Sequence, residues 1–510
     1  MISRRKASAK NASVAFTAQL IKMIGQFIVQ TVFVHTLGSE FLGANGLFNN
    51  LITFLSFAEL GIGAAFSYAL YAPLAKQDKK QTTAIINLYK QVYNIIGLGI
   101  LVVGLVLSYF VPFLTKSSAG LPHLRIYFVL YLLSTVVSYF FTYNRSLLIA
   151  DQRGYVDSKN QLYFSIIKYV FQLFFLILFN SYFGFLIVQI LSNLLSNISI
   201  TRLTYKQYPY LKTNRNEKID KSIVDKIKRN VIGTISSKIG SIVVTGTDNI
   251  LISKFVSLVA VGFYSNYSLI ITGITTVLNQ VLNAVIASFG NLGVTEKNNI
   301  QKQINLFNQF VFVNAFAVFF IGLFLFGVFQ PFVTLWLGSK YVLEDTTVLL
   351  IVINFVLALF RPALFLINAY GLFWGYRYKS IVEAIVNFGL SFILVNYTKL
   401  GINGVLLGTI VGNILVNSWW DPLILFGGAY HRGISKFYGK YWSYMGAFLI
   451  ILACEWYLKI KNVVLINHFI QLIIYAIILA IVLMVILIIL FCRTSGERFF
   501  IKRFNDFLNR

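Results

Sequence analysis

The sequence is poor in charge, and most of the charge that it has is of one sign. Only 12% of the 510 residues are charged, and 17 acidic residues stand against 43 basic ones, which gives a net charge of +26. Apolar residues make up 57% of the chain, and the mean hydropathy is +0.75. Soluble globular domains carry about 25% charged residues. The composition therefore excludes an ordinary soluble protein and indicates a polytopic membrane protein.

Residues that build reactive and metal sites are also scarce. The two cysteines, Cys454 and Cys492, indicate neither a disulfide framework nor a metal site. The four histidines are scattered near the ends of apolar runs without metal-ligand spacing: His35, His123, His431 and His468. No Gly-x-x-x-x-Gly-Lys-Ser/Thr phosphate loop occurs, so we expect no ATPase motor. We expect no catalytic residues, no metal and no cofactor.

Long apolar runs are what the chain has in abundance. They are continuous rather than alternating, which favours helices over barrel strands, and about 20 residues suffice to cross the hydrocarbon core. We therefore predict an all-α fold with about fourteen membrane spans. The predicted spans are 12–36, 42–72, 84–114, 123–150, 161–180, 182–203, 230–254, 260–290, 304–335, 343–370, 378–397, 399–426, 438–458 and 467–492.

Basic residues mark one side of these spans. If the N-terminus is cytoplasmic, the loops that fall inside collect most of the 43 lysines and arginines, including nine between Arg202 and Arg229. Arg377 and Lys379 are counted among these inside residues. The bias predicts that both termini are cytoplasmic. It also explains the net charge through contact with anionic lipid, without nucleic acid.

The chain also shows a weak internal repeat. EFLGANGL at 40–47 opens the second span, and LVAVGFYSN at 258–266 opens the eighth in a similar way. With six spans in each half, such repeats are parallel, and a site is expected between them. The predicted divisions are an N-lobe at 1–204, a cytoplasmic connector at 205–229, a C-lobe at 230–426, and two extra spans with a basic cytoplasmic tail at 427–510.

Six cations fall inside the predicted spans, where an unpaired charge is costly unless it faces a wet or paired interior. Lys22, Lys238 and Arg361 lie at similar depths, about 12–15 Å from the inner ends of their spans at about 1.5 Å per residue. Lys90, Arg145 and Lys168 are shallower by the same count, and their long stems could instead reach the headgroups. All six are candidate residues of a cavity for an anionic cargo.

Three acids were identified inside the spans: Glu59, Asp248 and Glu383. Glu383 and Asn387 are four residues apart and share a helix face. Glu383 either contributes to a cation site or neutralises Arg361 or Lys238. Pro362 follows Arg361 in mid-span, where it acts either as a gate or as a packed bend.

Four short stretches carry a resemblance to a known family. GTDNILISKF at 246–255 and VGFYS at 261–265 resemble the region of spans seven and eight in Wzx-type oligosaccharide-lipid flippases, in the MATE-like MOP exporter superfamily. LGSEFLG at 37–43 and LSFAELGIG at 55–63 look like the first hairpin of that family. The span count, the topology and the central polar segment extend the likeness over most of the chain.

The resemblance implies two six-helix lobes around a V-shaped central cavity, with two further C-terminal helices. It also implies a multi-pass flippase of the bacterial cytoplasmic membrane. Its cargo would be undecaprenyl-pyrophosphate-linked oligosaccharide repeat units, moved from the inner to the outer leaflet by alternating access. Membrane lipids, and a polysaccharide polymerase with other assembly proteins, would be its partners. Lipid-linked precursor flippases of the superfamily further suggest a coupling-ion site formed by Asp248, Glu383, Asn387 and Thr409.

Two alternatives remain from the sequence. A cation-coupled small-molecule or multidrug exporter of the same superfamily would share the fold, but net acidic charge in its cavity would be expected. A polysaccharide polymerase would be an enzyme, and such enzymes need a sizeable external loop, whereas the external loops here are short. We therefore expect a transporter rather than an enzyme.

Overall fold

The fold is helical throughout the part of the chain that the structure describes. The computed structural model describes residues 4–59, 62–116, 121–213, 224–225, 227–228, 231, 246–295, 299–372, 375–461 and 466–491. Every regular element in these ranges is a helix, and none of them contains a strand. The prediction of an all-α fold is therefore confirmed.

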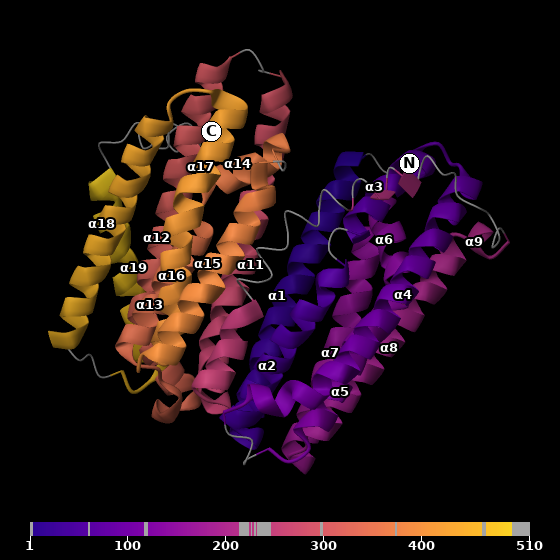
Figure 1. The fold of residues 1–510 in the computed structure, drawn as a ribbon, viewed down its shortest axis with the longest axis horizontal. Coiled ribbons are helices and arrows are strands. Elements are labelled where there is room, and N and C mark those ends of the chain that lie inside the picture. Colours follow the sequence, from indigo (N-terminus) through magenta and orange to yellow (C-terminus); the bar gives the residue numbers. More distant parts are fainter. Residues whose placement is uncertain are drawn as a thin grey trace. The chain divides into compact units, whose positions relative to one another are not determined.

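The chain divides into two compact units, Met1–Ser265 and Asn266–Arg510 (Figure 1). The first unit contains α1 (Arg4–Leu37), α2 (Ser39–Leu55), η1 (Ser56–Glu59), α3 (Ile62–Ala75), α4 (Lys79–Phe110), η2 (Val111–Leu114), α5 (Leu124–Tyr139), α6 (Thr142–Ala150), α7 (Gly154–Phe179), α8 (Tyr182–Gln207), α9 (Tyr210–Thr213) and a helical segment at 246–255.

Helix α11 (Leu258–Thr295) begins in the first unit and continues into the second. The second unit then contains α12 (Ile300–Leu337), η3 (Ser339–Tyr341), α13 (Asp345–Leu359), α14 (Pro362–Tyr370), α15 (Tyr376–Tyr397), α16 (Ile402–Gly412), the π-helical turn η5 (Asn413–Asn417), α17 (Ser418–Leu425), the π-helical turn η6 (Phe426–Tyr430), α18 (Ile434–Lys461) and α19 (Phe469–Phe491). The predicted connector at 205–229 falls largely outside the described residues, so the four predicted domain boundaries stay predictions.

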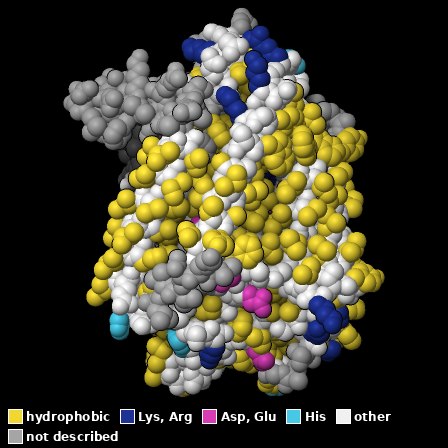
Figure 2. Space-filling model, turned by 90° about the vertical axis from the view of Figure 1, so that its left-hand side faces the viewer, with side chains coloured by type: hydrophobic (Ala, Val, Ile, Leu, Met, Phe, Trp, Pro, Cys, Tyr) yellow, Lys and Arg dark blue, Asp and Glu magenta, His cyan; other side chains and the backbone are white. Residues whose placement is uncertain are grey.

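Most helices follow the predicted spans, but the predicted span 42–72 is divided among α2, η1 and α3, and neither it nor 438–458 is among the candidate membrane spans of the described residues. Ten described helices are long and apolar enough to cross a membrane, or eleven if the bent pair α5–α6 counts as one span. In Figure 2, apolar side chains cover the middle of one face and Lys and Arg side chains lie toward its ends. The seventh predicted span is only partly described, because residues 232–245 lie outside the described ranges. The multi-pass membrane fold is therefore established, while the number fourteen stays a prediction.

A tight hairpin brings α7 and α8 side by side in the first unit. Asn180 ends α7 in the left-handed conformation at φ 46°, and the Ser181 hydroxyl accepts a hydrogen bond of 3.0 Å from the backbone N–H of Gly184 to open α8. Asparagine tolerates that conformation and serine is a favourable N-cap. A two-residue connection makes the helices antiparallel neighbours, and α1 packs along the other side of α7 (Figure 1).

The two segments that carry the weak sequence repeat lie against each other. A Cβ on Gly43 would overlap the carbonyl oxygen of Leu258, and a Cβ on Gly262 would overlap the carbonyl oxygen of Ser39. Each glycine therefore meets the residue four positions before the other. Such a reciprocal contact is what two elements related by a twofold axis form. The backbones approach so closely that only glycine fits at both positions.

Candidate functional site

Three helices of the first unit carry polar stripes. The stripes are Lys22, Gln26 and Gln30 on α1; Gln161, Ser165, Lys168 and Gln172 on α7; and Gln189, Asn193 and Asn197 on α8. Spacings of three and four residues place each stripe on one face of its helix. α7 packs against both α1 and α8, and most of these side chains are half-buried or buried, whereas Gln26 is exposed.

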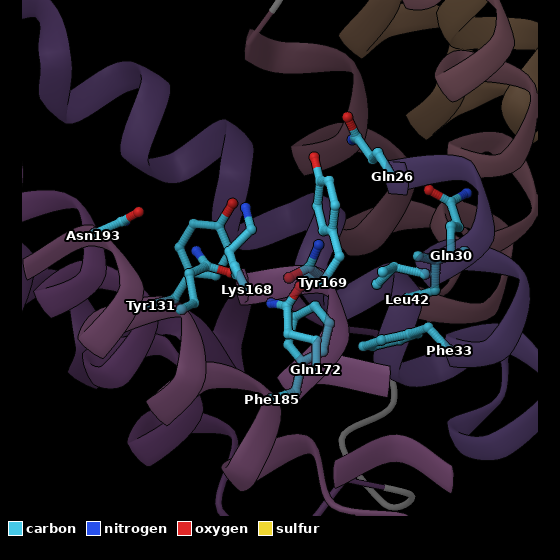
Figure 3. A pocket seen from close by; sticks show the side chains of 13 residues that line it. Gln26, Gln30, Phe33, Leu42, Tyr131, Lys168, Tyr169, Gln172, Phe185 and Asn193 are labelled. Carbon is cyan, nitrogen blue, oxygen red and sulfur yellow. The ribbon is translucent and has the colours of Figure 1, made fainter. Parts of the chain in front are cut away.

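Residues of all three stripes, though not Lys22, line two adjoining cavities. One has a volume of about 260 Å³ and the other about 280 Å³, and Lys168 and Asn193 line both. In the first, shown in Figure 3, amides alternate with the aromatic rings of Phe33, Tyr131, Tyr169 and Phe185. The second is lined mostly by hydroxyl and amide groups, together with Arg145. No carboxylate lines either cavity.

Two lysines in this region are held by neutral groups. The Lys22 ammonium donates to the Gln161 side-chain oxygen at 3.3 Å, and the Tyr169 hydroxyl donates to the Lys22 carbonyl at 3.1 Å. The Lys168 ammonium lies 5.1 Å from the centre of the Tyr169 ring. Among the described residues, neither ammonium has a carboxylate within 4.0 Å. Gln161 also donates to the Asp157 carboxylate at 2.9 Å, so Lys22 is linked to an acid through this amide, but neither lysine is directly paired with a carboxylate of the described residues.

The other two predicted cations of this unit differ from them. Arg145 forms an ion pair with Asp157 and donates to Ser196 and to Asn197, each at 2.9 Å. Asp157 was not identified from the sequence, because it falls in a predicted loop rather than at the start of α7. Lys90 is half-buried on α4 and, like Lys22, lines neither cavity, but within the described part of the chain it forms no hydrogen bond to a lining residue such as the one between Lys22 and Gln161.

In the second unit, the predicted cation belongs to a cluster of four charges. The two nitrogens of Arg361 closest to Asp421 lie 2.8 and 2.7 Å from its carboxylate, and another nitrogen lies 3.9 Å from Glu383. The Lys379 ammonium lies 2.7 Å from Glu383 and 3.4 Å from Asp421. Lys379 is 0% exposed and Asp421 2% exposed. The cluster is thus buried and its formal charges balance.

The prediction erred on two members of this cluster. Lys379 was counted with the cytoplasmic residues although the predicted span 378–397 contains it, and it lies buried on α15. Asp421 was not counted among the intramembrane acids, although it lies within the predicted span 399–426. From sequence alone, a charged residue close to the end of an apolar run fits either a loop or the buried part of a membrane-spanning helix. Only the packing of α14, α15 and α17 decides between them.

Three of the four predicted coupling-ion residues lie near this cluster. Asn387 donates to the Thr409 hydroxyl at 3.1 Å, and Glu383 accepts from the Asn417 amide at 2.7 Å. The Lys379 ammonium already contacts the Glu383 carboxylate. Asp248 belongs to the first unit, and an ion site with all four residues stays a prediction.

Arg361 itself lies at a break between two helices. α13 ends at Leu359 and α14 begins at Pro362, the helix position where proline costs no hydrogen bond. Arg361 therefore reaches the cluster from an interrupted helix.

Two predictions about the cations reach beyond what the described residues of one unit can test. Lys238 lies outside the described residues. The predicted convergence of Lys22, Lys238 and Arg361 also spans both units, so it stays a prediction. Among the described residues, no group of three or more His, Cys, Asp or Glu side chains has the arrangement of a metal site.

The polar lining of α7 and α8 was not predicted, although the sequence contains a signal for it. Gln161, Ser165, Lys168 and Gln172 recur with helical spacing in an otherwise apolar span. A polar stripe of this kind in a membrane helix faces other helices or a water-filled cavity. Considering only the charged residues missed the neutral ones beside them.

Residues 8–289, more than half of the chain, match a family model whose description is "Polysaccharide biosynthesis protein". Comparison with curated protein sequences gives no match.

Solved structures share the fold. The lipid II flippase MurJ in an inward closed conformation aligns with a TM-score of 0.65 at 13% identity, over 94% of this chain and 98% of that one. An inward-facing multidrug resistance MATE transporter of the MOP superfamily aligns at 0.63 and 16% identity, over 81% and 98%. A MOP transporter from Pyrococcus furiosus, described by the reverse polarity of its binding pocket, aligns at 0.53 and 16% identity, over 82% and 96%.

The family match and the shared fold confirm the resemblance inferred from the sequence. The neighbours are transporters and flippases, so the prediction of a transporter rather than an enzyme is confirmed. Identities this low establish the fold, and the cargo has to be argued from the residues of this chain.

Proposed function

The chain belongs to the polysaccharide biosynthesis protein family, and from this membership we propose that it is a flippase for undecaprenyl-pyrophosphate-linked oligosaccharide repeat units. It moves them from the inner to the outer leaflet of the bacterial cytoplasmic membrane for surface polysaccharide assembly. Both termini are cytoplasmic in this proposal. A polysaccharide polymerase and other assembly proteins take up the product.

One observation carries this proposal. Lys168 lines both cavities, Lys22 contacts Gln161 in the lining of the second, and neither ammonium forms an ion pair with a carboxylate of the described residues. Both lysines are half-buried within membrane-spanning helices, where a cation without a paired carboxylate is costly, and a diphosphate would supply a counter-ion. Lysine is a compact point charge and imposes no bidentate geometry, so it suits a headgroup that enters and leaves.

Transport proceeds by alternating access in this proposal. The sequence contains no nucleotide-binding loop, so a gradient must drive it. The headgroup enters the cavities while the lipid tail stays in the bilayer. Lys238, Arg361, Lys90 and Arg145 are proposed to guide the diphosphate along the path, and Asp248, Glu383, Asn387 and Thr409 to hold a coupling ion.

The test compares two neutralised lysines with a matched control. Lys22→Gln combined with Lys168→Gln should abolish flipping of undecaprenyl-pyrophosphate-linked saccharide in proteoliposomes, while the protein still reaches the membrane. Lys399→Gln changes an exposed lysine outside both cavities and should flip normally. Normal flipping by the double variant would refute the proposal.

The exporter alternative makes the opposite prediction about cargo charge. Lys22 and Lys168 would repel a cationic drug, and acidic variants of them would favour one. Uptake of a cationic dye by wild-type proteoliposomes, without flipping of the diphosphate lipid, would favour an exporter.

A further inference from the structure

The cavity of about 260 Å³ is lined by an amide that nothing in the described part of the unit uses. Gln172 is 2% exposed and lines the cavity, and it has no hydrogen-bond partner among the described residues. Its amide is not fully buried and opens onto the cavity, where a ligand can hydrogen-bond it. Figure 3 shows Gln172 on the same helix as Lys168 and Tyr169, which also line this space.

Two more amides are fixed so that their oxygens stay available. Gln189 donates to the Ser134 hydroxyl at 3.0 Å, and Asn193 donates to the Ser134 carbonyl at 2.9 Å. Both side chains line the cavity, and their oxygens accept no hydrogen bond from the described residues. The cavity therefore offers two acceptors from α8 and two donors from Gln172.

The remaining lining is aromatic rather than charged. Tyr131 and Tyr169 line the cavity beside the amides, and Lys168 at the border with the second cavity is the one charged residue in this lining. A ligand for this space has many neutral hydroxyl groups and apolar ring faces. A pyranose has both, whereas an acyl chain has no hydroxyls and a diphosphate has no apolar face.

We propose that Tyr131, Tyr169, Gln172, Gln189 and Asn193 form a saccharide subsite for the uncharged sugar ring next to the diphosphate, which lies against Lys168. This inference rests on the proposed flippase function. It adds that the first unit binds the sugar ring of the cargo as well as its diphosphate. The two cavities together have the size of a small-molecule site, which is about 300–1,000 Å³.

The test measures the binding of two probes to the purified full-length protein in detergent. One probe is undecaprenyl pyrophosphate, and the other is the same lipid carrying one N-acetylglucosamine. The wild type should bind the glycosylated lipid more tightly. Gln172→Met keeps the side-chain length but removes the amide, and it should weaken binding of the glycosylated lipid about tenfold, the effect of losing one or two neutral hydrogen bonds. Binding of the bare lipid should not change.

Three further variants control the measurement. Gln172→Ala cannot overpack the cavity and should give the same selective loss. Gln91→Met replaces an exposed glutamine on α4 and should change neither affinity. Lys168→Gln should weaken both probes.

The outcomes separate the two proposals. Equal binding of both lipids by the wild type, or equal effects of Gln172→Met on both, would overturn the saccharide subsite and leave the flippase proposal standing. Failure of the wild type to bind either lipid would overturn the flippase proposal, and the subsite with it.

Discussion

The two units of the protein place polar stripes on neighbouring helices and use them in opposite ways. In the first unit the stripes of α1, α7 and α8 surround cavities. In the second, the stripe Lys379, Glu383, Asn387 and Ser391 on α15 meets Thr409, Asn413, Asn417 and Asp421 on the facing chain. Asn387 bonds Thr409, Glu383 bonds Asn417, and Lys379 pairs with Asp421. The first arrangement opens polar groups to cavities, whereas the second pairs its charges with one another, although the side-chain oxygens of Asn387 and Asn417 are buried without a hydrogen-bond partner among the described residues.

The helix geometry accompanies this difference. A repeat of four residues drifts around a helix of 3.6 residues per turn. The π-helical turn Asn413–Asn417 lies in the middle of the stripe 409–421, where a wider turn reduces the drift. In the first unit the α7 stripe mixes spacings of three and four, the shorter α1 and α8 stripes repeat every four residues, and all three lie on uninterrupted helices. The position of a cation along a span therefore does not show whether it binds a ligand or has a structural role. The side chains that surround the cation show it.

The largest expected effect concerns the internally satisfied cluster. Asp421→Asn leaves Arg361 and Lys379 with one carboxylate between them, and breaking a buried pair costs about 3–5 kcal/mol. Thermal unfolding in detergent should show a large loss of stability. Asp345→Asn removes the partly exposed partner of Lys459 and should cost less than about 1 kcal/mol. Equal losses of stability in the two variants would contradict the view that the second unit depends on its buried charge cluster.

A carboxylate added to the first unit should make it resemble the second. Gln172→Glu is nearly isosteric and places an acid one helical turn from Lys168, where the two can pair. The added charge should weaken binding of undecaprenyl pyrophosphate about tenfold or more. Stability should change little, because Gln172 gives up no hydrogen bond to the described residues. Unchanged binding would mean that Lys168 does not contact the diphosphate.

The smallest expected effect is that of salt. Raising the ionic strength from 0.15 to 1 M shortens the Debye length from about 8 to about 3 Å. Binding of the diphosphate lipid to the water-accessible lysines should weaken severalfold. The thermal stability that depends on Arg361, Lys379, Glu383 and Asp421 should hold, because buried pairs are screened much less. A parallel loss of both would show that water reaches the cluster.

Much of the fold was predictable because apolar runs and their polar interruptions are local properties of the chain. The break between α13 and α14 was also predictable, because Pro362 marks it in the local sequence. The partners of the charges were not predictable, since Lys379 and Asp421 lie 42 positions apart and meet only when α15 packs against the chain around α17. Nor could the sequence distinguish Lys168 from Arg145, because what separates them is Asp157, three residues into α7.

The close contact of Gly43 with Leu258, and of Gly262 with Ser39, bears on the ancestry of the chain. Two copies of a half-length ancestor could have met through this same contact, each glycine receiving the backbone of the other copy. Joining their genes would then have added a linker without creating a new interface. A present-day gene cut within the polar segment 205–229 would encode two fragments that retain both halves of the contact. Co-expression of these fragments would show whether the two halves still associate into a folded protein.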